Sequence, residues 1–240
     1  MKDKLKRFFR ENWRLLYGLY VFIYFPWFFT LEKKITLQTP GVHILNTSID
    51  EAIPLIEWFI VPYILWAFYV VITVVYFYFK ADDKEYRQLA MSLIFGMSIA
   101  LTICMIYPNG LTLRPEHVSD SVFGRMITKL YISDTSTNVF PSIHVLNSLI
   151  VTFAIIKSKL FREKKFIIVK VCASILCVLI CLSTLFLKQH CISDVLGAML
   201  LFWVQTNLIY AVDYRKLYNR VRAKAMEGKL KELIQNRRAD

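Results

Sequence analysis

The sequence predicts an all-α membrane protein with six transmembrane helices. Of its 240 residues, 56% are hydrophobic and 15% are aromatic, and the apolar residues gather into runs too long for the core of a soluble domain. About 20 apolar residues are needed to cross the hydrocarbon as a helix, and only helices or closed barrels satisfy every backbone group there. The continuous apolar runs favour helices.

Six segments have the length and composition of membrane spans. They cover about residues 15–31, 53–79, 89–107, 142–161, 166–187 and 191–212. The first lacks a small-residue cleavage site before Glu32, so we expect a retained helix and no cleaved signal peptide. The loops are too short for a separate soluble domain. We therefore expect one membrane domain over residues 1–240, with a motif-bearing core at about 108–212 and a basic tail at about 213–240.

The basic residues predict the orientation of these spans. The formal net charge is +12, but Lys and Arg alternate with the spans and form no single patch, so we expect no nucleic-acid partner. If the N-terminus is cytoplasmic, the inner segments hold 23 Lys and Arg residues and the outer segments hold six. This asymmetry predicts a multi-pass protein of the cell membrane with both termini in the cytoplasm. The tail is interpreted either as a helix on the inner leaflet or as a solvated segment.

Two outer loops precede the segments that carry chemistry. The loop at 32–57 contains Pro40, Gly41 and Pro54 and is interpreted either as a lid or lateral entrance, or as an ordinary connector. It also holds the glycosylation sequon that starts at Asn46. The loop at 108–140 is the longest outer segment, and long loops beside a rigid scaffold often carry function.

Cysteine and histidine spacing predicts neither a disulfide framework nor a metal site. The five cysteines lie in or beside spans without paired spacing, so we interpret them as small apolar side chains, with Cys191 of interest because it follows His190. His43 and His117 lie in outer loops without partners at ligand spacing and are expected to face solvent. We expect no metal and no cofactor.

The segment QHCISD places His190 and Asp194 four residues apart, on one face of a helix if the sixth span begins there. The carboxylate can then accept a hydrogen bond from one imidazole nitrogen, which fixes the tautomer and leaves the other nitrogen as a nucleophile or base. The same spacing also fits a structural hydrogen bond or two metal ligands.

The segment FPSIH adds a second histidine beside a helix start. Ser142 is placed near the cap, so free backbone amides point outward beside His144 and favour phosphate binding. Arg114 can match two phosphate oxygens, and Lys188 can add a point charge. Either cation could instead anchor lipid headgroups at the surface. Every one of these residues falls on the predicted extracytoplasmic face.

Three segments together resemble the motifs of the type 2 phosphatidic acid phosphatase superfamily. They are LRP at 113–115, PSIH at 141–144 and HCISD at 190–194, in the family's order and spacing from about residue 108 to 212. The chain departs from the family at Tyr107, where a lysine is usual, at Ile143, where a glycine is usual, and at Thr184, where an arginine is usual. The loss of two cations is similar to the branch of inositol phosphorylceramide and sphingomyelin synthases.

The resemblance implies a two-step mechanism on a lipid phosphate at the membrane. His190 attacks phosphorus, Asp194 holds its tautomer, and His144 protonates the departing alkoxide and then activates the acceptor. The resemblance also implies that Arg114, Ser142 and the amides near His144 stabilise the transferring phosphoryl group.

Three functions are compatible with these residues. The leading prediction is a lipid phosphate phosphatase that acts on a phosphatidate-like or isoprenoid-phosphate lipid through a phosphohistidine intermediate. The alternative is a phosphodiester headgroup transferase, which the absent cations at Tyr107 and Thr184 favour. A catalytically silent lipid-binding protein is disfavoured, because polar residues at membrane depth are costly unless they are used.

Overall fold

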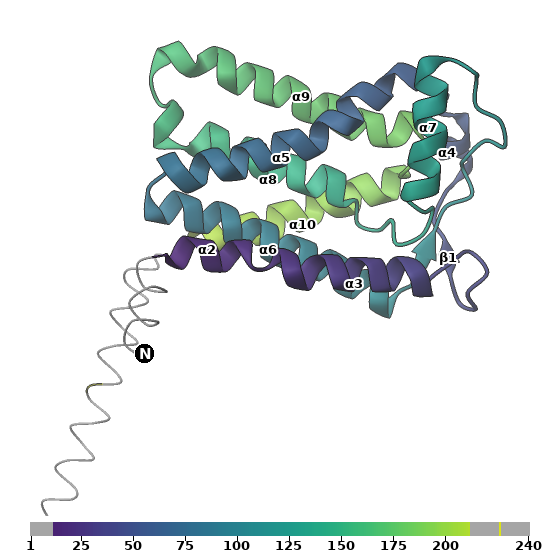
Figure 1. Ribbon diagram of the computed structural model, residues 1–240, viewed down its shortest axis with the longest axis horizontal. Coiled ribbons are helices and arrows are strands. Elements are labelled where there is room, and N and C mark those ends of the chain that lie inside the picture. The colour runs from purple at the N-terminus through teal and green to yellow at the C-terminus, as the bar shows by residue number, and fades with distance from the viewer. Residues whose placement is uncertain (1–11, 212–225, 227–240) are drawn as a thin grey trace, which may run out of the picture. The chain divides into compact units, whose positions relative to one another are not determined.

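A computed structural model describes residues 12–211 and Met226 (Figure 1). The chain divides into two compact units, residues 1–206 and 207–240. Every predicted site residue lies in the first unit. The predicted basic tail at 213–240 lies outside the described residues, apart from Met226.

The structure confirms an all-α polytopic protein. Among the described residues, five helical segments are long and apolar enough to cross a membrane, and they coincide with five of the six predicted spans. The first consists of α2 (Trp13–Gly18) and α3 (Val21–Lys34), the second of η1 (Glu57–Phe59) and α5 (Ile60–Lys80), and the third is α6 (Asp83–Ile106). The others are η3 (Lys164–Phe166) with α9 (Ile167–Phe186), and α10 (Ile192–Ala211).

The fourth predicted span is shorter than expected. Helix α8 (Ile143–Lys157) has 15 residues and is therefore about 22 Å long, less than the hydrocarbon thickness of roughly 30 Å. Ser158 ends it, because its hydroxyl donates to Glu85 at 2.6 Å and accepts from the backbone of Leu160 in the short turn η2 (Lys159–Phe161). Helix α8 thus coincides with the fourth of the six predicted spans but is shorter than the other five.

Helix α8 packs against three neighbours in the first unit. It contacts α5, α6 and α9, and Figure 1 shows α5, α8 and α9 running side by side. Most of its side chains are buried, among them Leu146, Ile150 and Val151. A helix enclosed in this way presents little surface to lipid, so it need not match the thickness of the bilayer.

The two loops that the sequence predicts to be outer gather at one end of these helices (Figure 1). They contain β1 (His43–Ile44), α4 (Ser48–Ala52), β2 (Asn109–Gly110) and α7 (Val122–Ser133). The two strands pair in parallel, with His43 opposite Asn109. In addition, the side-chain oxygen of Asn46 accepts a 2.9 Å hydrogen bond from the backbone of Thr112. The first outer loop is therefore fastened to the second.

Candidate active site

His144, His190 and Asp194 form a connected chain of side chains. His144 Nδ1 lies 3.3 Å from His190 Nε2, and His190 Nδ1 lies 3.3 Å from Asp194 Oδ2. Asp194 is completely buried. The two predicted motif segments, 46 residues apart at their histidines, thus meet in space.

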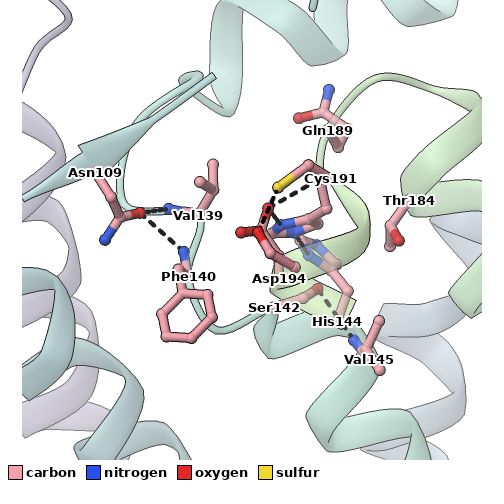
Figure 2. A network of polar contacts seen from close by, with 12 residues as sticks. Asn109, Val139, Phe140, Ser142, His144, Val145, Thr184, Gln189, Cys191 and Asp194 are labelled. Atoms are coloured by element: carbon pink, nitrogen blue, oxygen red, sulfur yellow. Dashed lines mark hydrogen bonds and ion pairs between the residues drawn. The ribbon is translucent and has the colours of Figure 1, made fainter. Parts of the chain in front are cut away.

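The position of Asp194 follows from the start of α10. It occupies the first turn, four residues after His190, and its Oδ2 also accepts the backbone N–H of Cys191 at 2.9 Å (Figure 2). A carboxylate can only accept, so it places the proton of His190 on Nδ1. His190 Nε2 then carries the lone pair, and His144 Nδ1 donates to it.

Ser142 positions His144 from the preceding turn. Its hydroxyl caps α8 by accepting the backbone N–H of Val145, and its own N–H donates to the carbonyl of Asp194 at 3.2 Å. This second bond joins the two motifs directly. Because Ser142 is fully buried and does not line the cavity described below, it acts as a cap and a tie between motifs.

Asn109 holds the loop before α8 and was missed by sequence reasoning. Its side-chain oxygen accepts the backbone N–H groups of Val139 and Phe140, each at 2.9 Å (Figure 2). The sequence feature that could have identified Asn109 is its position two residues after the third predicted span and directly before Gly110. Asn109 therefore fixes the approach of the chain to the PSIH segment.

His144 is flanked by two aromatic rings from α5. The ring centroids of Tyr63 and Trp66 lie 4.7 Å and 4.3 Å from that of His144. The Tyr63 hydroxyl donates to Asp134 at 2.7 Å. These contacts hold the imidazole against α5.

Arg114 reaches the histidines through Gln189. Its guanidinium donates to the carbonyls of Tyr131 and Thr135 and, at 2.7 Å, to Gln189 Oε1. Burial lowers the pKa of Arg114 from its usual value, although the nearby charge of Asp134 raises it. Arg114 does not itself line the cavity, whereas Gln189 does.

Gln189 lines the cavity and carries an unpaired donor. Arg114 fixes its Oε1, whereas its Nε2 is buried and has no hydrogen-bond partner within the described part of the chain. Gln189 was not among the residues predicted from the sequence, where its neighbour Lys188 was expected to contact phosphate.

Lys188 points away from the cavity. It is 6% exposed, and its ammonium donates to the carbonyl of Asp50 at 2.7 Å and to that of Glu51. Its backbone φ of +54° turns the chain here, so the side chains of Lys188 and Gln189 diverge. Burial lowers the pKa of Lys188, although the charges of Asp50 and Glu51 raise it. The expected phosphate contact of Lys188 is therefore replaced by an attachment to α4.

Asp50 completes this attachment and was also missed. Its Oδ1 accepts the backbone N–H of Ile192, the first residue of α10, at 2.8 Å. Its Oδ2 accepts the backbone N–H and the hydroxyl of Thr47, both at 2.8 Å. Burial raises the pKa of Asp50, but these donors outweigh it and the pKa lies below its usual value. The first outer loop thereby caps the helix that carries Asp194.

A cavity of about 430 Å³ opens beside the histidines. Its polar end contains His144, His190 and Gln189. Its walls are mainly apolar and come from α3, α5, α6 and the short connection before α3. They are formed by the side chains of Tyr20, Val21, Tyr24, Phe25, Phe28, Ala67, Val70, Val71 and Met97. Such a space suits a molecule with a polar head and an apolar chain.

Two carboxylates also line the polar end. Glu32, near the end of α3, accepts hydrogen bonds from Thr135 and Asn138, and Asp134 follows the end of α7. The two positions where the resembled family usually has a cation provide none. Tyr107 stacks on His43 at 4.1 Å and is 40% exposed, whereas the buried carbonyl of Thr184 accepts the N–H groups of Gln189 and His190.

The described residues form no metal-binding group, and their cysteines form no disulfide. Within residues 12–211 and 226, no three His, Cys, Asp or Glu side chains are grouped to hold a metal. All five cysteines are free, and buried Cys191 lies 3.0 Å from the hydroxyl of Ser193. His43 and His117 are exposed, as predicted.

Comparison with known families identifies the PAP2 superfamily. Its family model matches residues 89–218, which is more than half of the chain and extends from within α6 past the end of α10. No curated protein and no solved structure matches the chain.

Proposed function

Because the chain belongs to the PAP2 superfamily, whose members are phosphatases or related phosphotransferases, we propose that it removes phosphate from a lipid phosphate ester through a phosphohistidine at His190. The observation that supports this most is the linked geometry of Asp194, His190 and His144. One imidazole nitrogen of His190 is held by a buried carboxylate, and the other faces a second imidazole at the polar end of a cavity.

The first step forms a bond from His190 Nε2 to phosphorus and breaks the bond from phosphorus to the lipid oxygen. The resting contact between the two imidazoles occupies the Nε2 lone pair, so the rings separate as the phosphoryl group enters. Asp194 stabilises the positive charge that develops on His190. Protonated His144 gives its proton to the departing alkoxide, which leaves as a lipid alcohol.

The second step regenerates the enzyme. His144, now neutral, removes a proton from water as the water oxygen attacks phosphorus, and the bond from His190 to phosphorus breaks. Inorganic phosphate leaves. Asp194 keeps the proton of His190 on Nδ1 throughout, so Nε2 is ready for the next substrate.

Phosphate oxygens are stabilised by donors at the polar end of the cavity. Gln189 Nε2 offers an N–H group, and Arg114 polarises and orients that amide from behind. The first backbone N–H groups of α8 lie beside His144 and add the positive end of a helix dipole. The apolar walls accommodate the lipid chain, and the charge asymmetry of the sequence places this end of the bundle away from the cytoplasm.

A phosphodiester headgroup transferase is the second candidate. It is favoured by Glu32 and Asp134, because two carboxylates at the polar end repel a doubly charged phosphate monoester more than a singly charged diester. Tyr107 and Thr184 also supply no cation. The same residues then act in both steps, and an alcohol takes the place of water in the second step.

An assay of the purified protein in detergent distinguishes the phosphatase from the transferase. The protein is incubated with phosphatidate, an isoprenyl phosphate and a phosphodiester lipid, each with and without a lipid alcohol. Phosphate released from a monoester, absent with the His190→Ala variant, supports the phosphatase. A new phosphodiester that forms only with the alcohol supports the transferase. If neither product forms on any lipid while the protein remains folded, the proposal fails.

A further inference from the structure

Two residues that line the cavity carry buried polar atoms that have no partner in the described part of the chain and that the proposed mechanism does not use. Asn147 lies on α8, three residues after His144 and thus one helical turn further along the helix. Trp66 lies on α5 and packs against His144. Both side chains line the cavity, and neither Asn147 Oδ1 nor Trp66 Nε1 has a hydrogen-bond partner among residues 12–211 and 226.

These atoms require an explanation because of where they lie. Asn147 is 3% exposed, and its neighbours Leu146, Ile150 and Val151 belong to the apolar core. Inside a membrane protein an unpaired polar group is expensive, since no bulk water can satisfy it. Polar residues at this depth are therefore retained where they bind something.

The two atoms have complementary hydrogen-bonding roles. An indole N–H can only donate, and an amide oxygen can only accept. A cation would be poorly placed against the Trp66 donor, and an anion would be poorly placed against the Asn147 oxygen. A hydroxyl group satisfies both, because it accepts from Trp66 and donates to Asn147.

We propose that Asn147 and Trp66 form a subsite for the hydroxyl group of a lipid alcohol. The subsite lies where the polar end of the cavity meets its apolar walls, so a hydroxyl carried on an apolar chain fits better than a free sugar or water. The role of this subsite rests on the proposed function, because the bound alcohol is either the product of hydrolysis or the acceptor in transfer. In both cases the hydroxyl lies beside His144, the group that gives or takes its proton.

Binding of an alcohol without any phosphate donor tests the subsite separately from catalysis. The probes are dioleoylglycerol, its O-methyl ether and the deoxy analogue, measured by equilibrium binding to the full-length protein in detergent. The ether keeps the acceptor oxygen but cannot donate to Asn147, and the deoxy analogue can do neither. We expect wild-type protein to bind the alcohol roughly five- to tenfold more tightly than the ether.

Matched variants assign the preference to each residue. Asn147→Leu should bind the alcohol and the ether equally, because only donation to Asn147 distinguishes them. Trp66→Phe should weaken both the alcohol and the ether relative to the deoxy analogue. Trp58→Phe is the control, because Trp58 is exposed and does not line the cavity, and it should behave as wild type.

Two results would overturn the subsite: equal wild-type affinities for the alcohol and its ether, or a preference that survives in Asn147→Leu. The first comparison needs no variant, so it stands even if a substitution prevents folding. If the protein binds the alcohol preferentially but transfers no phosphoryl group, the subsite is supported and the proposed function is refuted. If the protein hydrolyses lipid phosphates but does not prefer the alcohol over its ether, the proposed function is supported and the subsite is refuted.

Discussion

Replacement of Asp50 by alanine should weaken both the fold and the active site, although Asp50 is far from the histidines in sequence. The carboxylate accepts hydrogen bonds from Ile192 and Thr47 at 2.8 Å. Its loss leaves the Ile192 N–H buried and unpaired, at about 1–3 kcal/mol. It also removes the capping box of α4, at about 0.5–2 kcal/mol. The expected total is about 1.5–5 kcal/mol.

Thermal unfolding in detergent and turnover of a lipid phosphate should both report this loss. For a chain of this size, 1 kcal/mol corresponds to about 2–4 °C, so the melting temperature should fall by roughly 3–20 °C. Turnover should fall as well, since α10 carries Asp194. Glu51→Ala is the matched control, because Glu51 is the exposed acidic neighbour on the same helix. Wild-type melting and turnover in Asp50→Ala would refute the assignment.

The stabilisation by Asp50 should also depend on pH in a defined direction. The pKa of Asp50 is lower in the folded protein than its usual value of 3.8, so the unfolded chain binds a proton more readily. The stabilisation is complete above that value and is lost as the pH falls through the lower, folded pKa. The difference in melting temperature between wild type and Asp50→Ala should narrow below about pH 4. A difference that stays constant from pH 7 to pH 3 would contradict this.

Three further outcomes follow from the site. Gln189→Leu removes the amide that we propose as a donor to phosphate and should reduce turnover about 10²- to 10³-fold, as for loss of one oxyanion donor; unchanged steady-state kinetics would exclude a role in phosphate binding. Asn109→Leu leaves the N–H groups of Val139 and Phe140 unpaired and should destabilise the protein by about 2–5 kcal/mol, which chemical unfolding would detect or rule out. Turnover of wild-type protein should have a bell-shaped pH profile, because one imidazole acts neutral and the other protonated; a flat profile with chemistry rate-limiting would argue against His144 as acid and base.

The sequence predicted those parts of the site that depend on local geometry. His190 and Asp194 are four residues apart, and this spacing alone places them on one helical face. Ser142 was predicted as a cap because serine before an apolar run commonly begins a helix. Both placements agree with the structure.

The remaining features depend on contacts between distant segments. Lys188 was expected to face phosphate, but a left-handed backbone at that residue and the carbonyls of α4, 137 and 138 residues away, direct it elsewhere. Asp50 caps a helix 142 residues later in the chain. Helix α8 ends early because Ser158 bonds to Glu85 on another helix. No periodicity or short motif carries such information.

Covalent trapping tests the central claim most directly. Wild-type protein is mixed with a lipid phosphate labelled at phosphorus, quenched in alkali to preserve phosphohistidine, digested and analysed by mass spectrometry. The account predicts label on His190 in wild type, none in His190→Ala, and reduced label in Asp194→Asn. Label on any other residue, or turnover in wild type with none on His190, would contradict it.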